Sequence, residues 1–518
     1  MSTLYIFGIG GTGSRVIRSL TMLLAAGVEL KNCDRVVPII IDPDATNGDK
    51  QRTIELLKTY QRLRSQIKPA APGASTYGQF FGADIQTLAS LARPGEQRDT
   101  RVKDTFEYSF SGMEEPLRDY LRYTNLPVES QYLVDLLFDP KSLDENLKVG
   151  FKGSPNVGSV VLNQLVDSPE FQFFGNEFRA GDRIFFISSI FGGTGAAGFP
   201  LLLKNLRDRD AKLPHIELLN TAPIGALSLL PYFSLKSEDS SAIDSNTFIT
   251  KTKAALAYYQ NNLTGLNAMY YLGDQAQKQN DNHEGGISQQ NNAHFIEVVG
   301  ALAVLDFLDK PDSIAHEEHF YEFGLERDES ELRFESFDRR QTLPLVGEAL
   351  TRFHFFATWL QHHLDETMSA TYATNLGLKN AWDREPFYQD LRRFLFDYNS
   401  PDRQFISYTA WLRELRDNSR RFRPFNLRDG YDPQNHWDSM MDLLEPDFDK
   451  AVAGKELKKK GLFGKSDVID PKQIRVMLDK RLSQAVTNDT ASSPATAMLR
   501  TFTEVMDEVV HGQQLPTG

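Results

Sequence analysis

The stretch LYIFGIGGTGSRVIRSLTMLLAA, residues 4–26, decides the fold class. Its first six residues, 4–9, form an apolar run that stops at glycines, which is typical of a buried parallel strand. Residues 14–26 then place apolar side chains at helical spacing. A second apolar run, RVVPIII at 35–41, ends at Asp42. Strand, glycine turn, helix and strand in this order predict an α/β fold with a doubly wound, mostly parallel sheet.

The same alternation continues to about residue 310. Residues 48–149 hold polar and helical stretches broken by prolines, and they indicate an insertion at the rim of the sheet. Regular alternation resumes near Gly150. We expect helices at 158–166, 195–208 and 291–308, and strands at 183–189, 216–219, 224–230 and 267–272. Residues 1–310 are therefore expected to form one α/β domain.

Residues 311–518 have a different character and predict a helix-rich C-terminal domain. Amphipathic helices are expected at 345–368, 386–397, 405–419 and 471–486, with a weak strand signal at 332–337. All four tryptophans lie in this part of the chain. An aromatic-rich helical region forms either a core or a partner-binding surface, and both readings stay open. Residues 454–468 are expected to form a mobile loop.

Composition limits the classes of function. The formal net charge of −13 argues against a nucleic-acid partner, because phosphate backbones attract basic surfaces. Cys33 is the single cysteine, so an intrachain disulfide and a cysteine-rich zinc site are both excluded. No run approaches the roughly 18 apolar residues of a membrane span. We expect a soluble, cytoplasmic protein without membrane insertion.

The first glycine loop, GIGGTGS at residues 8–14, lies between a predicted strand and a predicted helix. Its backbone N–H groups can converge on an anion, helped by the helix dipole. Gly8, Gly10 and Gly13 also match the G-x-G-x-x-G fingerprint of dinucleotide binding, in which Asp42 would accept a ribose hydroxyl. Taken alone, this loop favours an NAD or FAD domain, with a structural tight turn as the alternative.

A second glycine loop, IFGGTGAAG at residues 190–198, follows the strand predicted at 183–189 and leads into a helix. It again offers backbone donors at a helix N-terminus, and Thr194 adds a hydroxyl. A dinucleotide domain needs only one such loop. Two loops on separate strands indicate a di- or triphosphate held from two sides. The lysine-bearing P-loop of common NTPases is absent from the sequence.

Several motifs in the first 310 residues resemble the tubulin/FtsZ superfamily, and most closely its divergent prokaryotic members. The second glycine loop resembles the GGGTGTG or GGGTGSG signature of that family. Other segments follow in the family's chain order. They are GGTG at 10–13, DPDA at 42–45 (NTDAQ in the family), GSPNVG at 153–158 (AGANPEVG), ALSLLPYF at 226–233 (VVTKPF), and Asn291 or Asn292 at the start of the long helix.

The resemblance implies a filament-forming, cytoskeletal type of protein that binds GTP or GDP and whose assembly follows the bound nucleotide. It implies phosphate contacts from eight residues of the two glycine loops: Gly10, Gly11, Thr12, Gly13, Gly192, Gly193, Thr194 and Gly195. Asn156 and Gly158 would contact the terminal phosphate. Asp42 and Asp44 would lie near the ribose or metal, and Asn292 would recognise the base. Mg²⁺ would come with the nucleotide, and the protein itself is expected to supply no dedicated metal site. Self-association, or a protein partner, is expected to use the C-terminal region.

One part of the family pattern is missing. Members that hydrolyse GTP carry an acidic NxDxxD loop after the central helix, and no such motif follows residue 308. Asp306, Asp309 and Asp312 are acidic but differ in spacing. Hydrolysis therefore stays undecided at this point. Three functions remain: a GTPase or GTP-controlled assembling protein, a dinucleotide-dependent oxidoreductase, and a scaffold that binds nucleotide without turnover.

Overall fold

A seven-stranded sheet in the order β3-β2-β1-β4-β5-β7-β9 organises the chain, and every pairing in it is parallel. Its strands are β1 (Thr3–Ile9), β2 (Arg35–Ile41), β3 (Asp84–Ile85), β4 (Arg183–Ser189), β5 (Ile224–Leu229), β7 (Ala268–Leu272) and β9 (His319–Phe323). This is a computed structural model. It describes residues 2–68, 78–92, 100–151, 154–235, 246–275, 279–280, 285–323, 331–333, 336–337, 342–362, 382, 384–396, 404–424, 459–460, 466–467 and 493–510.

The chain order of the strands reverses between β1 and β4, which are hydrogen-bonded neighbours. From β1 the chain proceeds outward through β2 and β3, and from β4 it proceeds the other way through β5, β7 and β9. Every residue of β1 and β4 is buried, as expected for the continuous apolar runs of parallel strands. The carboxyl ends of both strands meet at one edge, at the topological switch point of the sheet.

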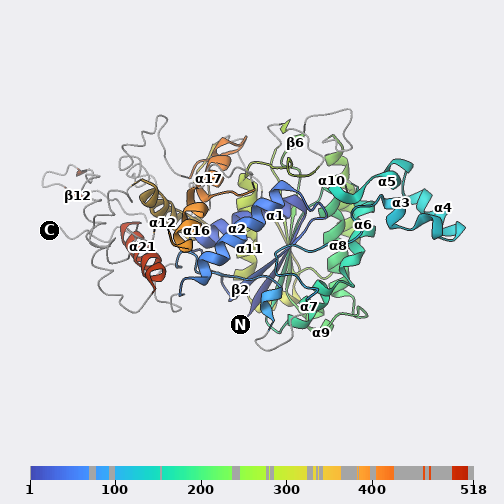
Figure 1. Ribbon diagram of the computed structural model, residues 1–518, viewed down its shortest axis with the longest axis horizontal. Helices are drawn as coiled ribbons and strands as arrows, with labels where there is room; N and C mark the ends of the chain where they lie inside the picture. Colours follow the sequence, from blue (N-terminus) through green and yellow to red (C-terminus); the bar gives the residue numbers. More distant parts are fainter. Residues whose placement is uncertain are drawn as a thin grey trace.

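Helices cover both faces of the sheet (Figure 1). One layer contains α1 (Gly10–Ala25), α2 (Gly48–Ser65) and α11 (Phe295–Asp309), and the other contains α6 (Pro155–Leu162), α7 (Pro169–Glu177) and α8 (Gly193–Arg207). Successive residues of β4 pack against opposite helix layers. Phe185 lies 5.4 Å from Phe307 of α11, whereas Phe186 lies 5.6 Å from Phe199 of α8, measured between ring centroids. The predicted doubly wound α/β fold is therefore confirmed.

Most of the elements predicted in the α/β part are present with small shifts at their ends. The helices expected at 14–26, 158–166, 195–208 and 291–308 are α1, α6, α8 and α11, and the strands expected at 4–9, 35–41, 183–189, 224–230 and 267–272 are β1, β2, β4, β5 and β7. The strand expected at 216–219 is wrong, because these residues lie in the helix α9 (Ile216–Thr221). β4 pairs directly with β5, so the sheet has no position for a strand between them. A four-residue apolar run does not distinguish helix from strand.

The start of the range 48–149 also differs from the expected insertion. Helix α2 packs against α1, and β3 extends the sheet beside β2. These two elements therefore belong to the α/β layers. The later part of the range carries η1 (Ala89–Leu91), α3 (Leu117–Tyr120), η2 (Tyr123–Asn125), α4 (Val128–Leu137), α5 (Pro140–Asp144) and η3 (Leu147–Val149).

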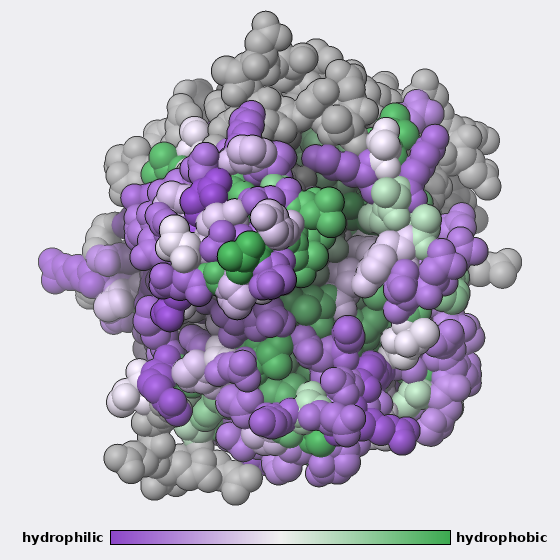
Figure 2. All heavy atoms as spheres, turned by 90° about the vertical axis from the view of Figure 1, so that its right-hand side faces the viewer, coloured by the Kyte–Doolittle hydropathy of each residue, from purple (hydrophilic) through white to green (hydrophobic). Residues whose placement is uncertain are grey.

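Helix α4 projects from one end of the molecule (Figure 1) and exposes an apolar stripe. Five of its apolar side chains are more than half exposed: Val128, Tyr132, Leu133, Leu136 and Leu137. Figure 2 faces this end and shows hydrophobic side chains at the surface among hydrophilic ones. In the part of the chain that the structure describes, no helix is long and apolar enough to cross a membrane.

The C-terminal region adds a helical layer beside α2. The helices expected at 345–368, 386–397 and 405–419 are present as α12 (Thr342–His362), α16 (Pro386–Phe396) and α17 (Tyr408–Asp417), and α21 (Pro494–Val510) packs on α12. The aromatic residues of these helices form a core, in which Trp359 and Trp411 are fully buried. The helix expected at 471–486 and most of 454–468 lie outside the described residues.

The other described elements are short or lie between the main ones. They are η4 (Asn163–Leu165), β6 (Ser234–Leu235), α10 (Asn246–Asn262), β8 (Gln279–Asn280), η5 (Asp312–His316), β10 (Glu331–Leu332), β11 (Arg421–Phe422), β12 (Lys459–Lys460) and β13 (Ser466–Asp467). The weak strand signal at 332–337 corresponds to β10, which pairs in parallel with β11 of the C-terminal region.

Candidate functional site

The first glycine loop joins β1 to α1 at the switch point of the sheet. Helix α1 begins at Gly10, whose φ of +73° lies in the left-handed region, and no side chain caps the first turn. Its free backbone N–H groups and the helix dipole favour an anion. Gly13 has a different role, because a Cβ there would lie 2.5 Å from the carbonyl carbon of Gly8. Gly13 is therefore required for close packing of helix and strand, and Gly10 shapes the loop.

The other two positions of this loop face neighbouring segments. A Cβ on Gly11 would lie 3.6 Å from Nδ2 of Asn47, in ordinary contact with the loop after β2. Thr12 is buried, and its hydroxyl accepts a hydrogen bond of 3.4 Å from Nη2 of Arg15.

The second glycine loop repeats this arrangement between β4 and α8. Gly192 is the N-cap of α8, and no side-chain oxygen satisfies the first N–H groups of the helix. A Cβ on Gly195 would lie 2.7 Å from the carbonyl oxygen of Ser189 at the end of β4, so the loop is folded tightly onto its strand. Neither α1 nor α8 has an acidic residue in its first turn, so both helix N-termini stay favourable to an anion.

The two glycine loops contact each other. A Cβ built on Gly10 would lie 3.7 Å from Cβ of Thr194 and 4.0 Å from the backbone nitrogen of Gly195. Because β1 and β4 are neighbours, the N-termini of α1 and α8 open at the same edge of the sheet, one on each face. The structure therefore brings together the predicted residues of both loops: Gly10, Gly11, Thr12 and Gly13 with Gly192, Gly193, Thr194 and Gly195.

The third predicted segment lies at the start of α6. Gly158 packs tightly on the second loop, since a Cβ there would lie 2.9 Å from Cβ of Ala197 and 3.1 Å from the carbonyl oxygen of Gly193. Asn156 is exposed in the first turn of the same helix. Residues 152–153 of this segment lie outside the described part of the chain. Helix α6 thus packs its first turns against the second glycine loop.

The two predicted aspartates after β2 are buried and engaged by their own loop. Oδ1 of Asp44 accepts hydrogen bonds of 2.9 Å from both N and Oγ1 of Thr46, and Oδ2 accepts one of 2.6 Å from the N–H of Gly286. Asp42 accepts from the N–H of Asp44 at 3.0 Å. Burial raises the pKa of Asp42 to about 7, although nearby Lys50 lowers it. Both carboxylates stabilise the loop after β2, and Asp44 connects it to the segment before α11.

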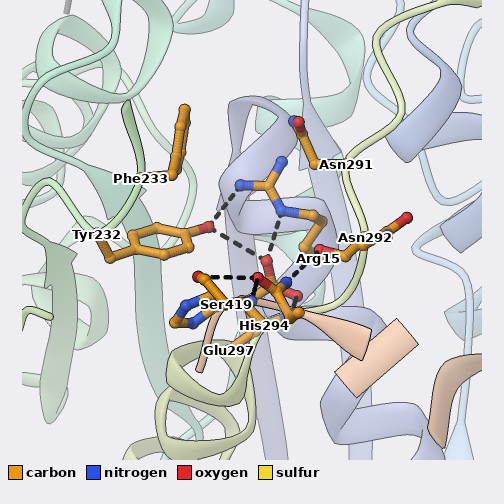
Figure 3. A pocket seen from close by; sticks show the side chains of 9 residues that line it. Arg15, Tyr232, Phe233, Asn291, Asn292, His294, Glu297 and Ser419 are labelled. Carbon is orange, nitrogen blue, oxygen red and sulfur yellow. Dashed lines mark hydrogen bonds and ion pairs between the residues drawn. The ribbon is translucent and has the colours of Figure 1, made fainter. Parts of the chain in front are cut away.

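A pocket lies beside these loops, at the start of α11 (Figure 3). It is lined by Arg15, Tyr232, Phe233, Asn291, Asn292, His294, Glu297, Asn418 and Ser419, which we call the side-chain pocket. Figure 3 shows the two aromatic rings on one side and Asn291 and Asn292 on the other, with Arg15 between them. The pocket thus contains Asn292, the predicted base-reading residue, and the end of the 226–233 segment. Its aromatic faces and amide groups suit a flat heterocycle with donors and acceptors on its edge.

Arg15 joins the first glycine loop to this pocket. Its guanidinium donates to Glu297 at 2.6 Å, to Asp49 at 3.0 Å and to the hydroxyl of Tyr232 at 2.5 Å. Burial opposes its charge, but Tyr232, Glu297 and Asp49 outweigh burial and hold the pKa of Arg15 well above its usual range. Burial opposes the charge of Asp49 as well, but Arg15, Arg18 and Arg52 lower its pKa overall. The pocket wall therefore contains a buried charge network, in which Arg18 is a second cation, 3.3 Å from Asp49 and 3.9 Å from Glu297.

His294 supplies a neutral polar group. Burial lowers the pKa of His294 to about 4, against a smaller opposite effect of Asp274. Its Nδ1 accepts the backbone N–H of Ile296 at 3.1 Å and so caps α11, which leaves the proton of the neutral ring on Nε2. The ring centroid lies 5.0 Å from that of Tyr232.

The second glycine loop reaches the pocket through aromatic rings in edge-to-face contact. Phe191 of the loop lies 5.5 Å from Phe233, and Phe233 lies 5.1 Å from Tyr232, between ring centroids. Both glycine loops are therefore connected to the side-chain pocket, one through Arg15 and one through Phe191.

Five pocket residues were not predicted from the sequence: Arg15, His294, Glu297, Asn418 and Ser419. Glu297 had a usable signal, because it is the one charge in the apolar run 295–305 of the long helix, and such a buried charge needs a partner. Asn418 and Ser419 had none, because they follow an ordinary amphipathic helix in a distant part of the chain. Among the described residues, no cluster of three or more His, Cys, Asp or Glu side chains could hold a metal ion.

Comparison with known proteins gives matches among solved structures. No protein-family model and no curated protein sequence matches the chain. Solved structures that match include CetZ2 from Haloferax volcanii, described as a GTPγS-bound protofilament, and CetZ from Methanosaeta thermophila. These are tubulin/FtsZ-like proteins. Each shares 13% sequence identity over 60% of this chain, with TM-scores of 0.28 and 0.25.

The match covers only part of those proteins. This chain spans 58% of the CetZ2 chain and 56% of the other CetZ chain, which is less than two thirds of either. A likeness at this identity and TM-score does not extend to a shared function. We therefore infer the function from the loops and the pocket of this chain.

Proposed function

We propose that the chain binds a guanine nucleotide, GTP or GDP, across the two glycine loops and the side-chain pocket. The contact between the loops at the switch point of the sheet supports this most strongly. Two helix N-termini without side-chain caps lie there within contact of each other, from neighbouring strands. A single dinucleotide loop would leave the second one without a ligand. A mononucleotide with two or three phosphates uses both.

The proposal assigns one part of the nucleotide to each part of the site. The phosphates contact the backbone of both loops, with the hydroxyl of Thr194 as a further donor. Asn156 and Gly158 lie on the side of the terminal phosphate. The base enters the side-chain pocket, where Asn292 meets its edge and Tyr232 its face. Mg²⁺ would be held mainly by phosphate oxygens, as is usual for this ion, and Asp44 would approach the ribose or the metal.

We further propose that the bound nucleotide controls assembly, either with a second copy or with a partner, through the C-terminal region and in the cytoplasm. Phosphate-contacting loops have two arrangements, with and without the last phosphate, and a surface that distinguishes them shifts the assembly equilibrium. The exposed apolar stripe of α4 is an additional surface that association would bury.

Isothermal titration of the purified chain with GTP, GDP, ATP and NAD tests the binding proposal. We expect GTP and GDP to bind and ATP and NAD to bind more weakly or not at all. Tight NAD binding without GTP binding would overturn it in favour of a dinucleotide-dependent oxidoreductase. The absorbance of nicotinamide or flavin in the purified protein is an independent check on that alternative.

A second candidate, a scaffold that binds nucleotide without hydrolysis, is favoured by the end of α11. Asp306 pairs with Lys310 at 3.1 Å, Asp309 with Lys31 at 3.0 Å, and Asp312 with Arg183 at 2.8 Å. These carboxylates bind neighbouring side chains of the same chain. Light scattering and phosphate release, measured together with GTP, separate the two candidates. Assembly without phosphate release supports the scaffold, and release that accompanies assembly supports a GTPase.

A further inference from the structure

The side-chain pocket has walls from two distant parts of the chain. Seven of its nine lining residues belong to the α/β part, and the other two, Asn418 and Ser419, follow α17 in the C-terminal region. The family resemblance ends at about residue 310. The resemblance therefore assigns no role to Asn418 and Ser419, although both line the pocket.

The C-terminal wall is bonded to the backbone of the pocket itself. Nδ2 of Asn418 donates to the carbonyl of Ala293 at 2.8 Å, and the N–H of Ala293 donates to Glu414 at 2.9 Å. Ala293 lies between two lining residues, Asn292 and His294. A movement of the backbone at residues 292–294 would therefore move the α/β wall and the C-terminal wall of the pocket together.

Two buried contacts hold the same segment on the α/β part. Arg420 pairs with Asp274, just after β7, with an Nε–Oδ2 distance of 3.0 Å, and both side chains are about 95% buried. Arg52 of α2 pairs with Glu414. Residues 414–420, which we call the α17 latch, are thus fixed at both ends and line the pocket in the middle.

The chain just beyond the latch continues this attachment. The ring of Phe422 packs 5.1 Å from that of Phe295, in the first turn of α11. The N–H of Arg423 donates to the carbonyl of Leu332 at 2.8 Å. The latch therefore consists of the end of α17 and the residues that join it to β11, and both elements belong to the C-terminal region.

We propose that the α17 latch completes the base end of the nucleotide site, so that nucleotide binding and docking of the C-terminal region are thermodynamically coupled. This inference rests on the proposed guanine-nucleotide binding. A base that contacts Asn418 and Ser419 binds better when the latch is docked, and by reciprocity the nucleotide then strengthens docking. The coupling gives the nucleotide a direct route to the C-terminal region, which carries the proposed assembly surface.

Hydrogen exchange of the full chain, with and without GDP, tests the coupling without any substitution. GDP is expected to slow amide exchange about tenfold in residues 408–424 as well as in the two glycine loops. Protection of the glycine loops without any change in 408–424 would overturn the latch and leave nucleotide binding intact. Protection in neither place would refute nucleotide binding, and with it the coupling.

Substitution of the latch gives a second test. Asn418→Ala removes a pocket wall, and Arg420→Gln loosens the latch without touching the pocket lining. Both are expected to raise the Kd of fluorescently labelled GDP by about tenfold. The control is Asn261→Ala on α10, where an exposed asparagine bonds only to the carbonyl of Ala257 in its own helix. Unchanged GDP affinity in both latch variants would contradict the proposal.

Discussion

The glycine loops and the side-chain pocket lie next to each other and are built by different means. The loops present backbone N–H groups at helix ends, and glycines there allow close approach of chain to chain. The pocket is built from side chains, and its inner part is buried, with a charge network around Arg15 and a neutral His294. Changes in the loops should therefore act mainly on ligand affinity. Changes in the pocket should act on folding as well, because a buried charge left unpaired is unfavourable.

The largest expected effect follows from removing the charge of Arg15. Arg15→Met leaves the buried carboxylates of Glu297 and Asp49 to share Arg18, so that one negative charge among these side chains is uncompensated. We expect the free energy of unfolding to fall by about 3–5 kcal/mol. Urea denaturation measures this. The matched control is Lys31→Met, which breaks an ion pair with Asp309 whose side chains are 58% and 55% exposed. Its effect should stay within about 1 kcal/mol. Equal losses in both variants would contradict the description of the network.

The next effect is a pH dependence from His294. Its pKa of about 4 in the folded chain lies below the ordinary value of 6.5. The unfolded state therefore binds the proton first as pH falls. The contribution of His294 to the free energy of unfolding is fully present above pH 6.5. It is lost as the pH falls from about 6.5 to 4, and the loss reaches about 3 kcal/mol.

The variant His294→Asn isolates this effect, because asparagine keeps the helix cap without titrating. The raised pKa of Asp42 acts in the opposite direction, but it contributes equally to both proteins and cancels in their difference. We expect wild type to lose stability relative to the variant as pH falls from 7 to 4.5, in denaturation curves at each pH. Parallel curves would show that His294 does not titrate in this way.

A smaller effect, on binding, is expected at the loops. Gly10→Ala places a Cβ at φ +73° in the contact with Thr194, and we expect the Kd for GTP to rise about tenfold at a stability loss of about 1 kcal/mol. Gly181→Ala is the control. Gly181 has φ +90° with nothing within 4 Å of its Cβ position, so it carries the same backbone strain away from the site. Similar GTP affinities in the two variants would count against phosphate binding at the loops.

The smallest effect is expected at Asn292. Asn292→Ala removes one amide from the edge of the pocket, and the Kd for GDP should rise about fivefold, in line with the loss of one hydrogen bond. Titration calorimetry with GDP measures it, again with Asn261→Ala as the control. An unchanged Kd would place the base elsewhere.

The same comparison explains how much the sequence alone could predict. The loops are local, so the run of residues 4–26 and the second loop at 190–198 each predict a strand, a turn and a helix from adjacent residues. These alternations predict the doubly wound, mostly parallel class of the sheet. The prediction of a strand at 216–219 was wrong because a short apolar run fits the periodicity of a helix and of a strand equally well. The direct pairing of β4 with β5 leaves no place in the sheet for a strand between them.

The pocket depends on contacts between distant residues, which adjacent residues do not reveal. Arg15 and Glu297 are 282 positions apart, and Asn418 and Ala293 are 125 apart. A charge in an apolar helix indicates that a partner is needed, but it does not identify that partner. Asn292 was predicted only through its resemblance to a family motif. The C-terminal wall had no sequence signal at all.

A crystal or cryo-EM structure of the chain with GDP tests the central claim most directly. We predict phosphate density between the loops at 10–13 and 193–195, with the base in the side-chain pocket against Tyr232 and Asn292. A nucleotide bound anywhere else, or phosphates on the first loop alone with the ribose on Asp42, would contradict it.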